Sequence, residues 1–174
     1  MEVKGAALLY TLATLSVTFA GFAALLLMLR QSAGASLSAL DRFLARTIVG
    51  HFFWLAAGAI IPPVLGLYEL PEPLIWKGSA VLFGLPMLAI LLTYQRRRIA
   101  ATGSSAPPRI LIVFVGVGSL SLVAMIAAIF ANFAYSATVY ASAIAVNFIT
   151  HCYAVVTALE VILSQQLDRT SKGG

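Results

Sequence analysis

Two histidines are the residues of this sequence best suited to chemistry, and both lie inside long apolar runs. Imidazole binds protons, haem iron and transition metals, so His51 and His151 could hold a b-type haem axially or contribute to a metal site. Counting about 1.5 Å per helical residue from Arg46 and from Glu160 puts the two rings at depths that differ by roughly 6 Å. Neither histidine has a second ligand one turn away. We therefore expect two hydrogen-bonded histidines and no cofactor, with haem or metal as the alternative.

Polar residues recur at three- and four-residue steps along the last apolar run. Such a face is costly against lipid, so it must point at other helices or at water. Hydrogen bonding between helices explains it most simply. The alternative is a path for protons or a solute, with His151 and Glu160 as titratable stations. The main members of this face are Asn147, Thr150, His151, Thr157 and Glu160, flanked by Tyr140 and Ser164.

Catalytic signatures are missing from the sequence. It has no phosphate-binding Walker loop, no HExxH zinc motif, no GxSxG nucleophile motif and no GxGxxG dinucleotide motif. Cys152 is the single cysteine, so neither an intramolecular disulfide nor a CxxC redox pair exists. We expect that the protein is not an enzyme.

The composition is that of a membrane protein. Of its 174 residues, 61% are hydrophobic and only 10% are charged, and the mean hydropathy is +0.98. A soluble domain carries about 25% charged residues to cover its surface. The net charge of +5 does not indicate nucleic-acid binding, because the basic residues stand at the ends of apolar runs.

The elements that must position these residues are predicted to be five transmembrane helices in a single all-α domain, 1–174. A helix needs about 20 apolar residues to cross a bilayer. Ser38 and Asp41 resemble an N-terminal helix cap, so the second helix can begin before the membrane. The expected spans are about 6–29, 44–68, 74–94, 110–133 and 138–163, with a linker at 99–109 and a flexible polar tail at 168–174.

Prolines and glycine interrupt two of the predicted helices. Pro62 and Pro63 remove two backbone donors late in the second run and should kink or end the helix there. Gly84 and Pro86 indicate a bend in the third. Broken helices expose backbone groups that can line a site, which modestly favours transport.

The basic residues predict the orientation. Two of the eleven, Lys4 and Lys77, fall on one side of the five spans and nine on the other. By the positive-inside rule the N-terminus is outside and the C-terminus is cytoplasmic. Eight arginines against three lysines, with abundant alanine, hint at a bacterial inner membrane. The nine are Arg30, Arg42, Arg46, Arg96, Arg97, Arg98, Arg109, Arg169 and Lys172, and those up to Arg109 are expected to contact lipid headgroups.

The function that follows is a non-enzymatic membrane bundle that assembles with itself or with a membrane partner. Thr11, Thr14, Thr18 and Gly21 share one face of the first helix and permit close helix approach. The alternatives are a small channel or transporter using the polar face of the fifth helix, and a haem or metal protein. The expected partners are the bilayer, a second copy or another membrane protein, and not nucleic acid. A working site should lie between the fifth and second helices, on the cytoplasmic half.

Overall fold

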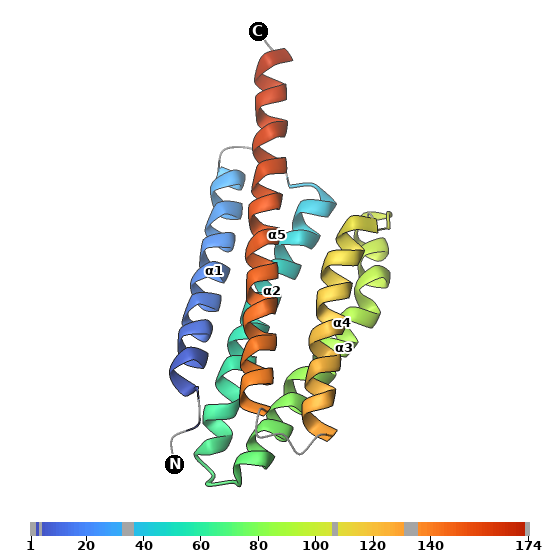
Figure 1. The fold of residues 1–174 in the computed structure, drawn as a ribbon. Coiled ribbons are helices and arrows are strands. Elements are labelled where there is room, and N and C mark those ends of the chain that lie inside the picture. Colours follow the sequence, from blue (N-terminus) through green and yellow to red (C-terminus); the bar gives the residue numbers. More distant parts are fainter. Residues whose placement is uncertain (1–2, 4, 33–36, 106–107, 131–135, 173–174) are drawn as a thin grey trace.

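The computed structural model describes the chain except residues 1–2, 4, 33–36, 106–107, 131–135 and 173–174 (Figure 1). Within the helices, side chains are described except those of residues 30, 108–112, 114, 128–130 and 158–172. The described part is all-helical and contains no strand, which confirms the predicted class. Its helices are α1 (Ala6–Ser32), α2 (Ala39–Gly66), α3 (Glu72–Thr102), α4 (Pro108–Phe130) and α5 (Ser136–Lys172).

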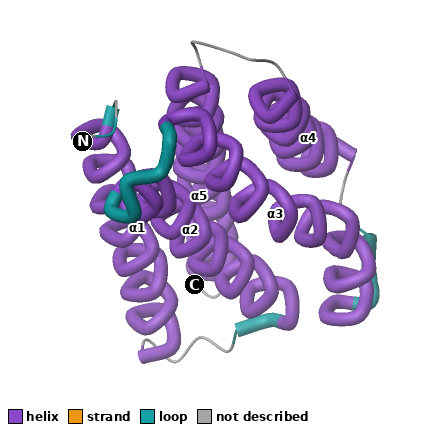
Figure 2. Tube along the Cα trace, turned by 90° about the horizontal axis from the view of Figure 1, so that it is seen from below, coloured by secondary structure: helices purple, strands orange, loops and turns teal. Residues whose placement is uncertain are grey.

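The helices form one bundle in which consecutive helices pack on one another. The helix α5 also contacts α1, α2 and α3, so it touches every other helix. Seen along the bundle, α5 lies among its neighbours (Figure 2). Polar side chains that face inward from α5 therefore meet other helices rather than the surroundings.

Local sequence signals place several helix ends. Ser38 caps α2: its hydroxyl accepts from the Asp41 amide at 3.1 Å, and the Asp41 carboxylate accepts from the Ser38 amide at 3.0 Å. This confirms the predicted cap. The helix α3 ends at Thr102, and the following Gly103 caps it with a φ of 70°, which is readily available to glycine.

Two predicted helices are longer in the structure, which shortens the predicted linker and tail. The helix α3 continues past 94 to Thr102, because arginine and alanine favour helix and no breaker precedes Gly103. The predicted linker 99–109 is therefore helical over its first four residues and again from Pro108. The helix α5 continues past 163 to Lys172, because no glycine or proline interrupts it before residue 173. Residues 168–172 of the expected tail are thus helical, and 173–174 lie outside the described residues.

The prolines do not end their helices where they stand. The helix α2 runs through Pro62 and Pro63 to Gly66, and α3 runs through Gly84 and Pro86. Each proline lacks the amide that would donate to the carbonyl four residues earlier. In a membrane bundle, contacts from neighbouring helices can take over such carbonyls.

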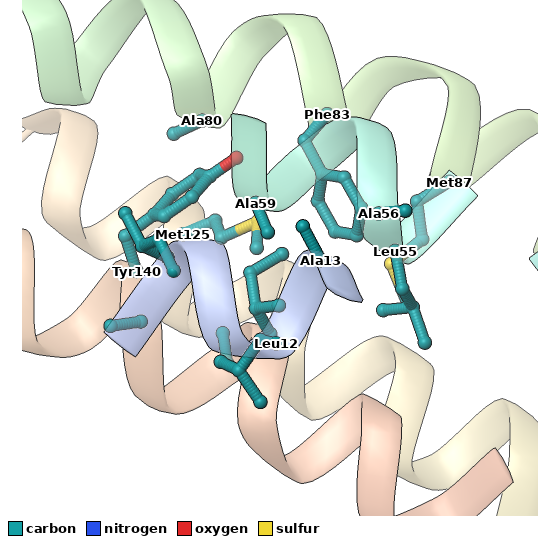
Figure 3. Packing of buried hydrophobic residues seen from close by; sticks show 14 of the residues in the cluster. Leu12, Ala13, Leu55, Ala56, Ala59, Ala80, Phe83, Met87, Met125 and Tyr140 are labelled. Atoms are coloured by element: carbon teal, nitrogen blue, oxygen red, sulfur yellow. The ribbon is translucent and has the colours of Figure 1, made fainter. Parts of the chain in front are cut away.

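The core interleaves large and small side chains from all five helices (Figure 3). Alanines such as Ala56 and Ala59 leave room for Phe83 and Tyr140 between α2, α3 and α5. Large apolar side chains also cover the outside of the bundle, among them Met28 and Leu120. Within the described residues, α1, α2, α3 and α5 are long and apolar enough to cross a membrane, and α4 contributes a shorter apolar stretch, Val115–Ala127.

Candidate functional site at the interface of α2 and α5

Among the described polar side chains of α5, Tyr140, Asn147 and His151 share one buried stripe. Tyr140, Asn147 and His151 are 1%, 2% and 6% exposed. Their spacing of seven and four residues puts them on one stripe of the helix. Each makes a contact with another helix, and the three contacts together form the candidate site.

Tyr140 closes the gap that a proline leaves in α2. Its hydroxyl donates to the carbonyl of Gly58 at 2.7 Å, across 82 residues of sequence. In a regular helix that carbonyl would accept from the amide of residue 62, which is proline here. Gly58 lies against the Phe83 ring so closely that a methyl group at this position would overlap it. The phenol thus replaces a missing backbone donor at a closely packed point of the interface.

Asn147 joins α5 to α4. Its side-chain amide donates to the Ser121 hydroxyl at 2.6 Å and to the carbonyl of Ala143 at 2.8 Å. Ser121 is itself 4% exposed, so the bond is shielded on both sides. This is the kind of polar contact that holds apolar helices in register.

The two histidines meet between α2 and α5. The rings of His51 and His151 stack with centroids 4.7 Å apart and planes 29° from parallel. Phe52 packs edge-on against His151 at 6.0 Å. Each histidine Nδ1 lies 2.7 Å from the carbonyl four residues earlier in its own helix, that of Thr47 or Asn147. Because a carbonyl only accepts, Nδ1 carries the proton in both rings, and Nε2 is the acceptor of each neutral imidazole.

This arrangement does not fit an axial haem. Axial ligands direct ring nitrogens at one another from opposite sides of the porphyrin, whereas these rings face each other with no room for a macrocycle. For a metal, the described residues contain no group of three or more suitable ligands. The geometry is that of a hydrogen-bonded, stacked imidazole pair.

The predicted polar face of α5 divides into two parts. Asn147 and His151 lie inside, whereas Thr150 is half-buried and Thr157 is exposed. Both threonine hydroxyls donate to carbonyls of their own helix, at 2.8 and 3.0 Å. Glu160 belongs to the helical part of α5, but its side chain lies outside the described residues.

The residues that were predicted to interrupt α2 lie about three turns from His51 and one turn from Gly58, the partner of Tyr140. Pro62 and Pro63 are buried one turn after Gly58. Gly84 is buried on α3, where a methyl group would be 3.4 Å from Leu122 of α4. Pro86 is half-buried in the same helix.

The arginines are not equivalent. Arg42, Arg46, Arg96 and Arg97 are exposed, as expected for residues that contact headgroups, whereas Arg98 is 4% exposed. The side chains of two others, Arg30 and Arg109, lie outside the described residues.

Sequence reasoning missed two features of the interior. It placed Tyr140 at the flank of the polar face without assigning it a partner, although Pro62 already identified Gly58 as a carbonyl in need of a donor. It also treated Arg98 as a headgroup contact equivalent to Arg96 and Arg97. No family model, curated protein or solved structure matches the chain.

Proposed function

We propose that this chain is an integral membrane protein whose five helices all cross the bilayer. With 23 residues, α4 would extend about 34 Å, compared with about 30 Å of hydrocarbon. The distribution of nine basic residues against two supports an outside N-terminus and a cytoplasmic C-terminus. The excess of arginine supports the bacterial inner membrane.

Reporter fusions test this topology. A fluorescent protein fused after Gly174 should fluoresce, because such reporters mature in the cytoplasm, and alkaline phosphatase fused after Leu70 should be active, because it folds outside. The reverse pattern, or active phosphatase at both positions, would rule out the proposed orientation.

The role we propose is that of a non-enzymatic bundle that assembles with a second copy or with a partner helix. The observation that carries this proposal is the use of the inward polar groups. Tyr140 and Asn147 each bond to another helix, and His151 stacks on His51. Polar groups that hold helices together are not at the same time available to line a solute path.

The outer face of α1 supports assembly. Thr11, Thr14, Thr18 and Gly21 are all exposed on it, and a methyl group at Gly21 would meet nothing within 4 Å. The three threonine hydroxyls donate to carbonyls of α1 itself at 2.9 Å. The side chains of this face are therefore small, and their hydroxyls already have hydrogen-bond acceptors. Close helix–helix contacts in membranes commonly use such small residues.

Assembly is tested by placing leucine on this face. Thr14→Leu with Gly21→Leu should lower the associated mass in mild detergent, or abolish crosslinks from a photoreactive group at position 18 of the same face in native membranes. Gly50→Leu is the matched control, since Gly50 is an exposed glycine with open space on α2. A wild-type protein that is monomeric and gives no crosslink from α1 would overturn the proposal.

The stacked histidines favour a second candidate, proton transfer through the bundle. Two imidazolium charges 4.7 Å apart would repel by about 3–4 kcal/mol at an effective dielectric of about 20. The neutral pair therefore takes up one additional proton far more readily than two. Such a pair can pass a proton between its Nε2 atoms and the surroundings. With an acidic outside buffer as the driving force, reconstituted protein would then acidify the liposome interior, and His151→Phe would stop this. Liposomes that contain the wild-type protein and remain impermeable to protons would rule out this candidate function.

A further inference from the structure

Arg98 is a buried cation whose Nε and Nη1 atoms lack a hydrogen-bond partner in the described part of the chain. Its side chain is 4% exposed. Buried guanidinium groups are normally paired, because an uncompensated charge removed from water is strongly unfavourable. The neighbouring Arg96 and Arg97 are exposed. Arg98 therefore has a role different from theirs.

The position of Arg98 on α3 gives it a defined direction. Phe83, Met87, Leu91 and Arg98 follow one another at steps of four, four and seven residues, so they share one face. Leu91 on this face would lie 2.8 Å from a methyl group placed at Gly118 of α4. Arg98 thus continues, two turns further on, the face by which α3 packs on α4.

The depth of Arg98 matches that of lipid phosphates, if the helices span the membrane as proposed above. From Leu74 to Arg98 the helix rises about 36 Å at 1.5 Å per residue. The hydrocarbon layer is about 30 Å thick, and about 40–45 Å with the headgroups. The guanidinium therefore lies beyond the hydrocarbon, in the headgroup layer of the arginine-rich side.

We propose that Arg98 binds a phosphate group, and that its source is the headgroup of an anionic phospholipid. Guanidinium is planar, permanently charged and matched to phosphate oxygens in geometry. The positive charges of Arg96 and Arg97 raise the local concentration of anions around it. A phosphate would supply the acceptors that Nε and Nη1 lack, and it would tie a lipid to the end of the α3–α4 pair.

The test uses the full chain in a neutral detergent. Phosphatidylglycerol, phosphatidylcholine and inorganic phosphate are titrated separately, and bound molecules are counted by native mass spectrometry. Arg98→Gln should weaken phosphatidylglycerol binding about tenfold or more, the loss expected for hydrogen bonds to a charged group. Arg96→Gln removes the same charge from an exposed neighbour and should change it little. Arg98→Lys, which keeps the charge, should bind with intermediate affinity.

Each outcome decides the question. Retention of phosphatidylglycerol but not of inorganic phosphate supports a lipid headgroup, and equal binding of both supports a phosphate site filled from solution. The site would be overturned if Arg96→Gln and Arg98→Gln weakened phosphatidylglycerol binding equally. It would also be overturned if neither Arg98→Gln nor Arg98→Lys changed that binding. The proposed membrane arrangement fails separately, if alkaline carbonate releases the chain from membranes. The detergent titration does not depend on that result.

Discussion

Replacing Tyr140 by phenylalanine removes one oxygen atom from a closely packed part of the bundle. The phenol is 1% exposed and donates at 2.7 Å to the Gly58 carbonyl, which Pro62 deprives of its helical donor. Phenylalanine keeps the ring and its packing against Trp76 and Phe83, at 5.9 and 6.3 Å between centroids. The loss is therefore confined to the hydrogen bond.

The expected loss is about 1–2 kcal/mol of unfolding free energy. Hydrogen bonds between membrane helices contribute about 0.6 kcal/mol on average and up to about 1.7. A buried acceptor left unsatisfied costs about 1–3 kcal/mol. Tyr140→Phe would leave the Gly58 carbonyl as such an acceptor. Its cost should therefore lie near the upper end of the values measured for hydrogen bonds between membrane helices.

Pro62→Ala provides the decisive comparison. Alanine restores the amide at 62, so the Gly58 carbonyl gains a helical donor and depends less on Tyr140. Tyr140→Phe should then cost about 0.5 kcal/mol or less, and the two changes should couple by about 1 kcal/mol, above the roughly 0.3–0.5 kcal/mol of ordinary non-additivity. Unfolding by sodium dodecyl sulfate in dodecyl maltoside micelles, followed by tryptophan fluorescence, measures each variant.

A matched control lies on the same helix. Tyr153 is 63% exposed, so Tyr153→Phe should leave the unfolding free energy within about 0.5 kcal/mol of the wild type. An equal cost of Tyr140→Phe with proline and with alanine at 62 would refute the link between the tyrosine and the proline. A cost no greater than that of Tyr153→Phe would refute the hydrogen bond itself.

Three further substitutions probe other contacts. Gly58→Ala should destabilise the protein by about 1–3 kcal/mol, because the added methyl group overlaps the Phe83 ring. Asn147→Leu should cost about 1–3 kcal/mol by leaving Ser121 without its buried partner, measured by the same unfolding assay. Ser38→Ala should cost about 1 kcal/mol through loss of the α2 cap, with earlier amide hydrogen exchange in the first turn of the helix.

Controls make these three results specific. Gly50→Ala adds the same methyl group to α2 in open space and should be neutral or slightly stabilising. Ser121→Ala, combined with Asn147→Leu, should recover part of the loss, since both polar partners are then gone. Uniform destabilisation by Gly50→Ala and Gly58→Ala would contradict close packing against Phe83. Unchanged exchange in Ser38→Ala would contradict the cap.

Much of the architecture follows from local sequence. Runs of apolar residues long enough to cross a bilayer predict the helices, and Ser38 with Asp41 predicts where α2 begins, because capping involves only neighbours in the chain. The errors lie at helix ends. Apolar periodicity stops at the expected membrane surface, whereas a helix stops at a breaker such as Gly103, so α3 and α5 proved longer than their apolar runs.

The location of the candidate site was a hypothesis from the sequence, which placed a working site between the second and fifth helices. Two isolated histidines in apolar runs, at similar estimated depths, indicated a meeting of the second and fifth helices, and the rings do stack there. Periodicity alone could not show which polar residues of α5 are buried, because Asn147 and Thr150 are both polar and lie within one turn of each other. Which of them is buried depends on the rotation of α5 against its neighbours.

Composition, period and missing amides are properties of the chain alone, and they were enough to predict a helical, apolar chain with prolines inside its helices. The packing of the helices was needed to show how two histidines face each other, which tyrosine serves the carbonyl left by Pro62, and which arginine is buried. These facts depend on the relative rotation and depth of helices that are distant in sequence. Packing of side chains such as Phe83 against Gly58 sets both quantities.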